Sequence, residues 1–585
     1  MSGIALTNPP RPGRVAFVLT AGLTVLTSVT SGPGLFSAGL IEADTAMRLV
    51  RIEDSIRAGS PLHAVLRDSS GQGTVLHWSH LLDTLVLIVA SPFAAVLGWH
   101  GGLTAAALLF GPLCMGALGV AVVWAVAPLC KAPLCQGHDR QTQGGAPLWL
   151  AALVLGLTPS IGQYGLIGTM HHHVPLVVTA ALSCGWAVRA VMGGSGRAGI
   201  WCGVCTGTGL WFSPEALAPG LMAVGGIWAA WLVQPSLVAR QVLGQALAGT
   251  GAGLLVMTGL AWVLDPPAAG YLVAEPDRIS VMYVWLAGGV AVAGGIAWRT
   301  GARPLAILSG GVASVLWLHN YPQLLRGTEG LMSSAEARLF FDDILEMLPV
   351  SGPVATLAHL GTGLLAAAFL FAVAVKRRSW LVAYTGLCAV VLLVLASRHI
   401  RFAAYPAALA AALLPVAVTA AARWRPAQAT RLRMALMLAV LGLPVLAGII
   451  GAAVSPGPKD ETGLPGPNCD LRGAIALVRP LGDAIVLAPV NENPTLLWNT
   501  RARTVGTLYH RGIAGYVRLH AAWFDPADPH AAVLATQARY VLICPQPGLA
   551  GPEQSLTGQL ARNAPPPWLE FVAAQAGYVL YRLTP

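Results

Sequence analysis

The sequence is divided into long apolar segments, separated by short stretches that collect Lys and Arg. A helix of about twenty apolar residues crosses the hydrocarbon core of a bilayer, because its backbone polar groups are paired internally. Over the 585 residues, 55% are hydrophobic and only 10% are charged, which lies outside the balance of soluble domains. The sequence therefore predicts an α-helical polytopic membrane protein.

The net charge of +10 informs topology and does not indicate nucleic acid. Basic residues lie in short clusters between apolar segments and form no single basic face, so we expect no nucleic-acid partner. Cytoplasmic loops collect Lys and Arg, and the N-terminus is placed inside on this rule. The rule then predicts about thirteen transmembrane helices, at residues 15–38, 103–128, 147–167, 174–192, 199–213, 217–234, 241–264, 279–297, 304–320, 353–375, 379–397, 402–422 and 434–454.

The first two apolar runs need separate treatment. The run at 15–38 follows two arginines and is typical of a signal peptide or a retained signal-anchor; we expect the anchor, because the run is long and many spans follow. The run at 84–99 is short and contains Pro92, so it is placed outside the membrane or only partly inserted. The segments then predicted to lie outside are 39–102, 168–173, 265–278, 321–352, 398–401 and 455–585.

The composition changes after residue 454. A stretch rich in Pro and Gly, from Pro456 to Pro467, is typical of a linker. Beyond it, short apolar runs resemble buried strands and are separated by helical stretches. We therefore predict a transmembrane domain at 1–454 and a small soluble α/β domain at 455–585.

Two cysteines, Cys469 and Cys544, fall in this C-terminal domain. An exported domain is in an oxidising compartment, where such a pair can form a disulfide. Two buried thiols are the alternative, and the sequence leaves both open.

Two groups of polar residues in the outer segments are candidate metal ligands. Glu42 and Asp44 follow the first span, where two carboxylates can hold a divalent cation or simply solvate the start of a helix. The consecutive His171, His172 and His173 lie between two spans, where imidazoles can bind a metal or a phosphate or merely occupy the interface. Both interpretations stay open on these residues alone.

Later outer segments carry further charges. Asp342, Asp343 and Glu346 recur at near-helical spacing, which is typical of a solvated amphipathic helix. Arg398 and Arg401 lie outside, against the positive-inside rule, and either bind an anionic ligand such as phosphate or occur there by chance.

Two other polar features have weaker interpretations. Glu215, at the outer end of a span, either faces a cavity or lies in the membrane interface, and the interface is the simpler interpretation. The outer segment Glu275–Arg278 has no chemistry that the sequence assigns.

Taken in order, these motifs resemble the catalytic subunit of oligosaccharyltransferases, membrane glycosyltransferases of the GT-C class, over most of the chain. Glu42 followed by Arg48 is similar to the acidic motif after the first span of the family, although Asp usually stands where Glu42 does. The run from His171 to Val174 is similar to the family's Asp-His-His-Val, with His in place of Asp. Both substituted residues remain able to bind a metal.

Three later stretches extend the resemblance. Glu346 and Pro349 are similar to a Ser-Glu-x-x-Pro motif in a late outer loop, and Arg401 with Phe402 is similar to an Arg-Phe whose Arg contacts the lipid-linked phosphate. Asn491 stands where the family's Trp-Trp-Asp-Tyr-Gly motif has Asp, and the tryptophans are absent. This departure predicts a divergent bacterial branch whose acceptor is not an Asn-x-Ser/Thr sequon.

The resemblance implies transfer of a sugar or oligosaccharide from a polyprenyl phosphate or pyrophosphate donor to an unknown acceptor. The bacterial inner membrane is the expected location, with many spans among membrane lipids and a periplasmic C-terminal domain. The implied metal is Mn²⁺ or Mg²⁺, and the implied residues are the catalytic Glu42, Asp44 and Glu346, the metal-binding Glu42, Asp44, His171 and His173, and the substrate-binding Arg48, His172, Arg398, Arg401 and Asn491.

Three alternatives remain. A related GT-C enzyme would move one sugar from a polyprenyl-phosphate carrier, and an inactive homologue would only bind glycolipid. A transporter or flippase would also have many spans with polar groups among them.

Overall fold

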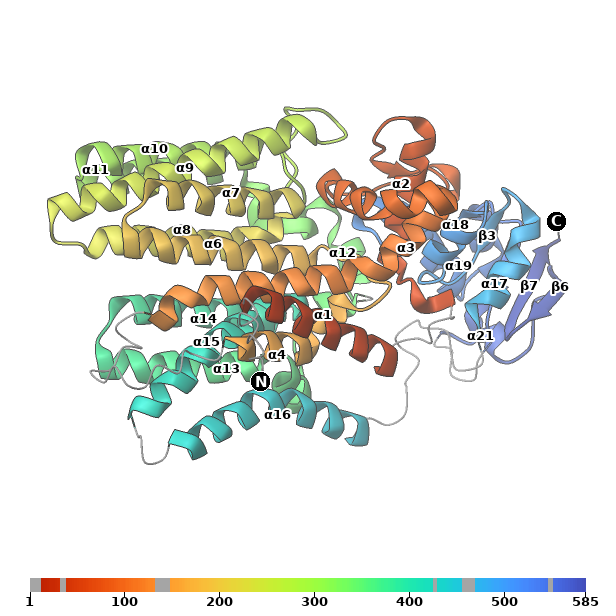
Figure 1. The fold of residues 1–585 in the computed structure, drawn as a ribbon. Coiled ribbons are helices and arrows are strands. Elements are labelled where there is room, and N and C mark those ends of the chain that lie inside the picture. The colour runs from red at the N-terminus through yellow and green to blue at the C-terminus, as the bar shows by residue number, and fades with distance from the viewer. Residues whose placement is uncertain are drawn as a thin grey trace.

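The computed structural model describes residues 12–31, 38–131, 148–342, 344–424, 429–454, 469–545 and 551–584. A bundle of long helices forms one end of the molecule, and the C-terminal domain lies at the other, beyond α2 and α3 (Figure 1). The bundle helices are α1 Pro12–Ser31, α3 His80–Lys131, α4 Trp149–Leu157, α6 His173–Gly193, α7 Gly196–Phe212, α8 Leu217–Val233, α9 Leu237–Leu264, α10 Val281–Thr300, α11 Arg303–Asn320, α13 Gly352–Arg377, α14 Trp380–Arg398, α15 Ala404–Trp424 and α16 Ala429–Val454.

Each of the thirteen predicted spans coincides with one of these helices. Among the described residues, nine helical segments are long and apolar enough to cross a membrane, namely those at α1, α3, α6, α8, α9, α10, α13, α14 and α15. The four other predicted spans coincide with α4, α7, α11 and α16. The polytopic helical architecture is therefore confirmed, and the chain is a multi-pass membrane protein.

Small residues explain how α7 packs on its neighbour α9. A Cβ on Gly199 would stand 2.1 Å from the carbonyl oxygen of Ala246, and a Cβ on Gly203 would stand 2.1 Å from that of Thr250. Glycines four residues apart on one helix face thus let the two backbones touch, as in other membrane helix pairs.

Helix α3 is broken at Gly98, where the backbone has φ 72° and ψ 169°. The two arms approach closely there, because a Cβ on Gly102 would lie 2.6 Å from the backbone nitrogen of Ala94. The segment 84–99 therefore forms an arm separate from the 103–128 span. Its depth relative to the bilayer stays a prediction.

The C-terminal domain contains a five-stranded mixed sheet in the order β4-β3-β5-β7-β6. The strand β3 pairs in parallel with β4 and β5, whereas β7 pairs antiparallel with β5 and β6. The elements are α17 Leu471–Val478, β3 Ile485–Leu487, α18 Asn493–Asn499, β4 Arg503–Thr504, α19 Ile513–Phe524, α20 Pro529–Ala535, β5 Tyr540–Ile543, α21 Leu556–Ala561, β6 Leu569–Gln575 and β7 Tyr578–Leu583. The predicted α/β character is confirmed.

A disulfide joins Cys469 to Cys544, with 6.1 Å between their Cα atoms. This resolves the alternatives left by the sequence in favour of the disulfide. The bond fastens the beginning of the domain to the end of β5.

The first outer segment binds this domain through buried polar contacts. The segment contains α2 Ala43–Ala58 and a two-stranded sheet of β1 Ala64–Val65 and β2 Thr74–Val75. The fully buried Asp68 accepts hydrogen bonds from the hydroxyl groups of Thr504 and Thr507 in the domain. The neighbouring Arg67 donates to the carbonyl oxygens of Leu497 and Thr500, at 2.7 and 2.8 Å. These hydrogen bonds fix the position of the first outer segment relative to the C-terminal domain.

Candidate active site

A cavity of about 3030 Å³ lies between the bundle and the C-terminal domain. Its wall includes residues from the first outer segment, the loop before α6, the start of α8, the late outer loop and the C-terminal domain. The predicted site residues in this wall are Glu42, Asp44, His171, His172, Glu346, Arg401 and Asn491. Most of the predicted site thus comes together although its members are far apart in sequence.

The acidic group at the start of α2 is positioned by helix capping. Glu42 is the N-cap, and its carboxylate accepts hydrogen bonds from the backbone N–H groups of Asp44 and Thr45, at 3.0 and 3.1 Å. Asp44 accepts a 2.7 Å hydrogen bond from the hydroxyl of Tyr509, which belongs to the C-terminal domain. Both parts of the protein therefore contribute to this group.

The three histidines are held against α2 by a tight loop. At Gly168 the backbone has φ 89°, and a Cβ there would stand 1.7 Å from the carbonyl oxygen of Leu40, so only glycine fits. The backbone N–H of Met170 donates to the hydroxyl of Thr45 at 2.8 Å. This docking brings the following histidines next to Glu42.

His171 completes the first of two clusters. Its Nε2 lies 3.3 Å from a Glu42 oxygen and its Nδ1 lies 3.8 Å from an Asp44 oxygen. Burial opposes a charge on the ring, but the two carboxylates raise the pKa of His171 to about 9. Burial and the neighbouring Glu42 raise the pKa of Asp44 to about 6, whereas His171 and the capped N–H groups outweigh burial and lower the pKa of Glu42.

The second cluster is centred on Glu215, in the short helix Pro214–Ala216 before α8. Its oxygens lie 3.8 Å from His172 Nε2 and 3.6 Å from His173 Nδ1. Arg401, in the helical turn Ile400–Ala403, approaches the same carboxylate with an Nη1–Oε1 distance of 2.9 Å. The interpretation of Glu215 as an interfacial residue is wrong, since it lines the cavity at the centre of a charged group.

Glu346 connects to this second cluster. It lies in the turn Leu345–Met347, and one of its oxygens is 3.5 Å from Nε2 of His173 and 3.4 Å from the hydroxyl of Tyr164. Burial would raise its pKa, but His173 and nearby cations lower the pKa of Glu346 to about 2. The expected amphipathic helix around it is wrong, because α12 Ser334–Phe341 ends before Asp342, and Asp343 lies outside the described residues.

The donor set suits a divalent metal. Ligand atoms of Glu42, Asp44 and His171 all lie within 4.8 Å of one another. Carboxylate oxygens with an imidazole nitrogen are ligands for Mn²⁺ or Zn²⁺. The adjacent His173 is buried, and its Nε2 makes no hydrogen bond. This nitrogen is therefore a further candidate ligand for the metal. An ion here would replace the proton that His171 carries between the two carboxylates.

Two predicted substrate contacts are placed elsewhere. Arg48 is buried, and its guanidinium pairs with Asp83 at 2.8 Å and lies over the ring of Trp78, so the predicted substrate role is replaced by a structural one. Arg398 is exposed at the end of α14 and is not among the residues that line the cavity. Asn491 does line the cavity, and its role stays a prediction.

Three cavity residues were missed by the sequence interpretation. Asp277, His510 and His77 meet in the wall, from a loop before α10, the C-terminal domain and the first outer segment. Only Asp277 carried a signal, as part of the charged outer segment Glu275–Arg278 to which the sequence assigned no chemistry.

No protein-family model matches the chain, and no curated protein sequence matches it. The comparison of structures is informative. The fold described above is that of solved oligosaccharyltransferase structures.

The particular structures are those of the oligosaccharyltransferase of the archaeon Archaeoglobus fulgidus. Its complex with Zn and sulfate has a TM-score of 0.63 at 14% identity, covering 98% of this chain and 73% of that one. The form tethered to an acceptor peptide with the NVT sequon has a TM-score of 0.63 at 14% identity, with 98% and 74% coverage. AglB bound to an inhibitory peptide and a dolichol-phosphate has a TM-score of 0.61 at 14% identity, with 91% and 69% coverage. The likeness establishes the fold.

Proposed function

We propose that the chain is a membrane glycosyltransferase that moves a sugar or oligosaccharide from a polyprenyl phosphate or pyrophosphate donor to an acceptor. The observation that carries the proposal is the convergence of Glu42, Asp44, His171, Glu346 and Arg401 on one cavity beside the outer domain. The fold neighbour AglB, which is bound to a dolichol-phosphate, supports a lipid-linked donor. The proposed setting is the outer face of a bacterial inner membrane, with the C-terminal domain in the periplasm.

The proposed phosphate-binding residue is Arg401. Its side chain is 20% exposed, and its Nε is buried without a hydrogen-bond partner, so the guanidinium has donors to spare after pairing with Glu215. Such a fixed cation stabilises charge that develops on a leaving phosphate. His172 lies in the same wall and supplies a second polar contact.

Glu42, Asp44 and His171 are the proposed metal ligands, with His173 and Glu346 beside them. A bound Mn²⁺ or Mg²⁺ supplies Lewis-acid stabilisation of the phosphate oxygens. Because Glu42 uses its oxygens to cap α2, Asp44 is the carboxylate better placed to orient or deprotonate the acceptor. Tyr509 holds Asp44 for this role through its 2.7 Å hydrogen bond.

The acceptor is proposed to differ from an Asn-x-Ser/Thr sequon. Val490, Asn491 and Glu492 line the cavity at the start of α18, where a pair of tryptophans is expected for sequon recognition in the family that the sequence resembles. Asn491 and Glu492 carry polar groups, Val490 is aliphatic, and none of the three offers aromatic surface. Another glycan, a lipid or a different peptide suits such a wall better.

The test is transfer by purified protein with extracted lipid-linked glycans and Mn²⁺ or Mg²⁺. Release of polyprenyl phosphate or pyrophosphate is expected for the wild type. Glu42→Gln keeps an oxygen for the helix cap while removing charge, and His173→Ala removes the imidazole whose Nε2 lies 3.5 Å from Glu346; both variants should lose transfer. Asp54→Asn, near the end of α2 and outside the cavity wall, is the matched control and should remain active.

The outcomes separate the alternatives. No release with any donor, together with glycolipid binding, would favour an inactive homologue, and donor translocation without release would favour a flippase. Full activity in both Glu42→Gln and His173→Ala would remove the site assignment.

A further inference from the structure

We propose that His77, Asp277 and His510 form a second metal site, of the zinc class, which joins the C-terminal domain to two outer segments of the membrane part. His77 follows β2, Asp277 precedes α10, and His510 begins the turn His510–Gly512 before α19. The site shares no residue with the proposed ligands Glu42, Asp44 and His171.

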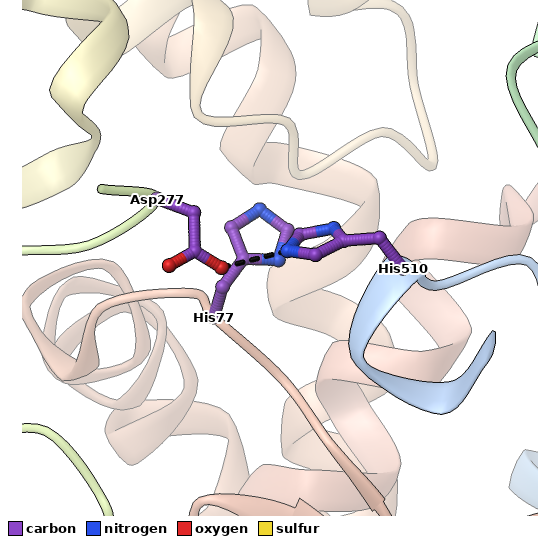
Figure 2. A group of neighbouring side chains, drawn as sticks. All are labelled: His77, Asp277 and His510. Atoms are coloured by element: carbon purple, nitrogen blue, oxygen red, sulfur yellow. Dashed lines mark hydrogen bonds and ion pairs between the residues drawn. The ribbon is translucent and has the colours of Figure 1, made fainter. Parts of the chain in front are cut away.

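The three side chains converge as metal ligands do. One ligand atom from each lies within 4.8 Å of the other two, and Figure 2 shows both imidazole rings meeting beside the Asp277 carboxylate. The two rings have centroids 4.5 Å apart, and Nε2 of His510 is 2.6 Å from Oδ2 of Asp277. Ligand atoms of a tetrahedral zinc site, each about 2.1 Å from the ion, are about 3.4 Å apart, so small rotations bring all three into range.

A purely structural network does not account for His77. Asp277, His510 and Arg511 already satisfy one another by hydrogen bonds, as a domain contact would. Nδ1 of His77 is nevertheless buried against this group and makes no hydrogen bond.

The surroundings also suit a cation. Arg511 fixes the orientation of Asp277 through Nε–Oδ2 and Nη2–Oδ1 contacts of 2.8 and 2.6 Å, the role that outer partners of metal-bound carboxylates usually have. The Arg511 charge is offset by Glu275, whose oxygens lie 3.1 and 2.6 Å away. Glu275 is shared with a second guanidinium, that of Arg278, at 4.0 Å, so the charges beside the imidazoles are held in a connected network.

The donor types select the ion. Two imidazoles and one carboxylate favour Zn²⁺ over Mg²⁺, which prefers oxygen ligands alone. The ion would replace the proton shared by His510 and Asp277, and that proton would pass to solvent. All three residues line the cavity, so an ion held by them would be within reach of molecules that enter it.

The experiment measures zinc stoichiometry in the full-length protein, stripped of metal in detergent and titrated with Zn²⁺ against a chromophoric chelator. The Glu42→Gln/His171→Ala variant removes the first proposed site and should keep one tight zinc. Adding His77→Gln should abolish binding of that zinc. The loss of zinc affinity should exceed the about 10–100-fold that follows when a residue hydrogen-bonded to a metal ligand is replaced. His530→Gln is the matched control, because Nε2 of His530 is also buried and unbonded but its ring stacks on Trp568.

The outcomes are distinguishable from failure of the proposed function. If the wild type binds one zinc and only His77→Gln removes it, the result would support this site and count against the site of Glu42, Asp44 and His171. An unchanged zinc content after His77→Gln in both backgrounds would overturn the proposal. X-ray absorption of the zinc in Glu42→Gln/His171→Ala must show imidazole ligands, and spectra without them would overturn it equally. His77→Gln removes no Nδ1 hydrogen bond, and an unaltered melting temperature of the metal-free protein checks its folding.

Discussion

Replacing Arg401 by Ala tests whether this cation stabilises the leaving phosphate. Arg401 lies in the cavity wall, with one nitrogen on Glu215 and a buried Nε that has no protein partner. Removing one preorganised donor to a developing negative charge usually costs about 100–1000-fold in kcat, or about 2.7–4 kcal/mol. We expect a loss of this size in kcat, with a smaller change in KM, because the contact strengthens in the transition state.

The same substitution also breaks an ion pair. Without Arg401, the partly buried Glu215 keeps only His172 and His173, at 3.8 and 3.6 Å. The double variant Arg401→Ala/Glu215→Gln removes both charges and separates the two effects. A purely structural Arg401 predicts that the double variant regains activity, whereas a phosphate-binding Arg401 predicts that it stays inactive.

The assay is the initial rate of polyprenyl phosphate or pyrophosphate release over a range of donor concentrations. Arg398→Ala is the control, because this exposed neighbour lies outside the cavity wall and should change the barrier by no more than about 0.5 kcal/mol. Recovery of activity in the double variant, or wild-type kcat in Arg401→Ala, would refute the reasoning.

Three further predictions concern the metal, the disulfide and the buried arginines. The pKa of His171 is raised to about 9 in the metal-free protein, so metal binding must displace a proton from this ring. The metal affinity should therefore rise about tenfold per pH unit between about pH 7 and 9. Calorimetry that finds no pH dependence of the affinity would contradict this. Replacing Cys469 and Cys544 by Ala opens a loop of 75 residues and should destabilise the C-terminal domain by about 4 kcal/mol, seen as faster limited proteolysis, and unchanged resistance would argue against it. Asp83→Asn leaves the buried Arg48 and Arg51 without their carboxylate partner and should lower the free energy of unfolding by about 3–5 kcal/mol. A melting temperature equal to that of the wild type would show that Arg48 is not held by this ion pair.

The membrane architecture was predictable because it depends on local properties. The length of an apolar run and the charge of its flanks decide whether it crosses a bilayer, and neither requires knowledge of distant residues. A helix accordingly lies at each predicted span. The backbone also breaks at Gly98, between the segment 84–99 and the predicted span 103–128. The span at 147–167 is shorter as a continuous helix, since α4 ends before Pro159.

Residue roles were less predictable where a partner lies far along the chain. Arg48 stands in a motif that resembles a substrate-binding one, but its guanidinium donates a hydrogen bond to Asp83, 35 residues later. Glu215 has no neighbour in sequence that indicates a site, and its importance comes from His173 and Arg401. Charged side chains acquire meaning from these pairings, which the fold alone creates.

The cluster of Asp277 and His510 is the extreme case. The two residues are separated by 233 positions and belong to different parts of the protein. Only the unexplained charges of the 275–278 segment hinted at an unknown partner. Charged outer segments to which the sequence assigns no chemistry are therefore good places to look for long-range contacts.

The buried contact of Asp68 with Thr504 and Thr507 has a consequence for how this protein can be divided. A fragment that begins at Cys469 would leave these hydroxyl groups, and the carbonyl groups bound by Arg67, facing water on a surface shaped for a missing piece. We expect such a fragment to be less stable than the same domain with residues 39–79 bound to it, because these hydrogen bonds are lost. In chimaeras with related enzymes, the unit to exchange is therefore the domain together with this distant stretch of the N-terminal half.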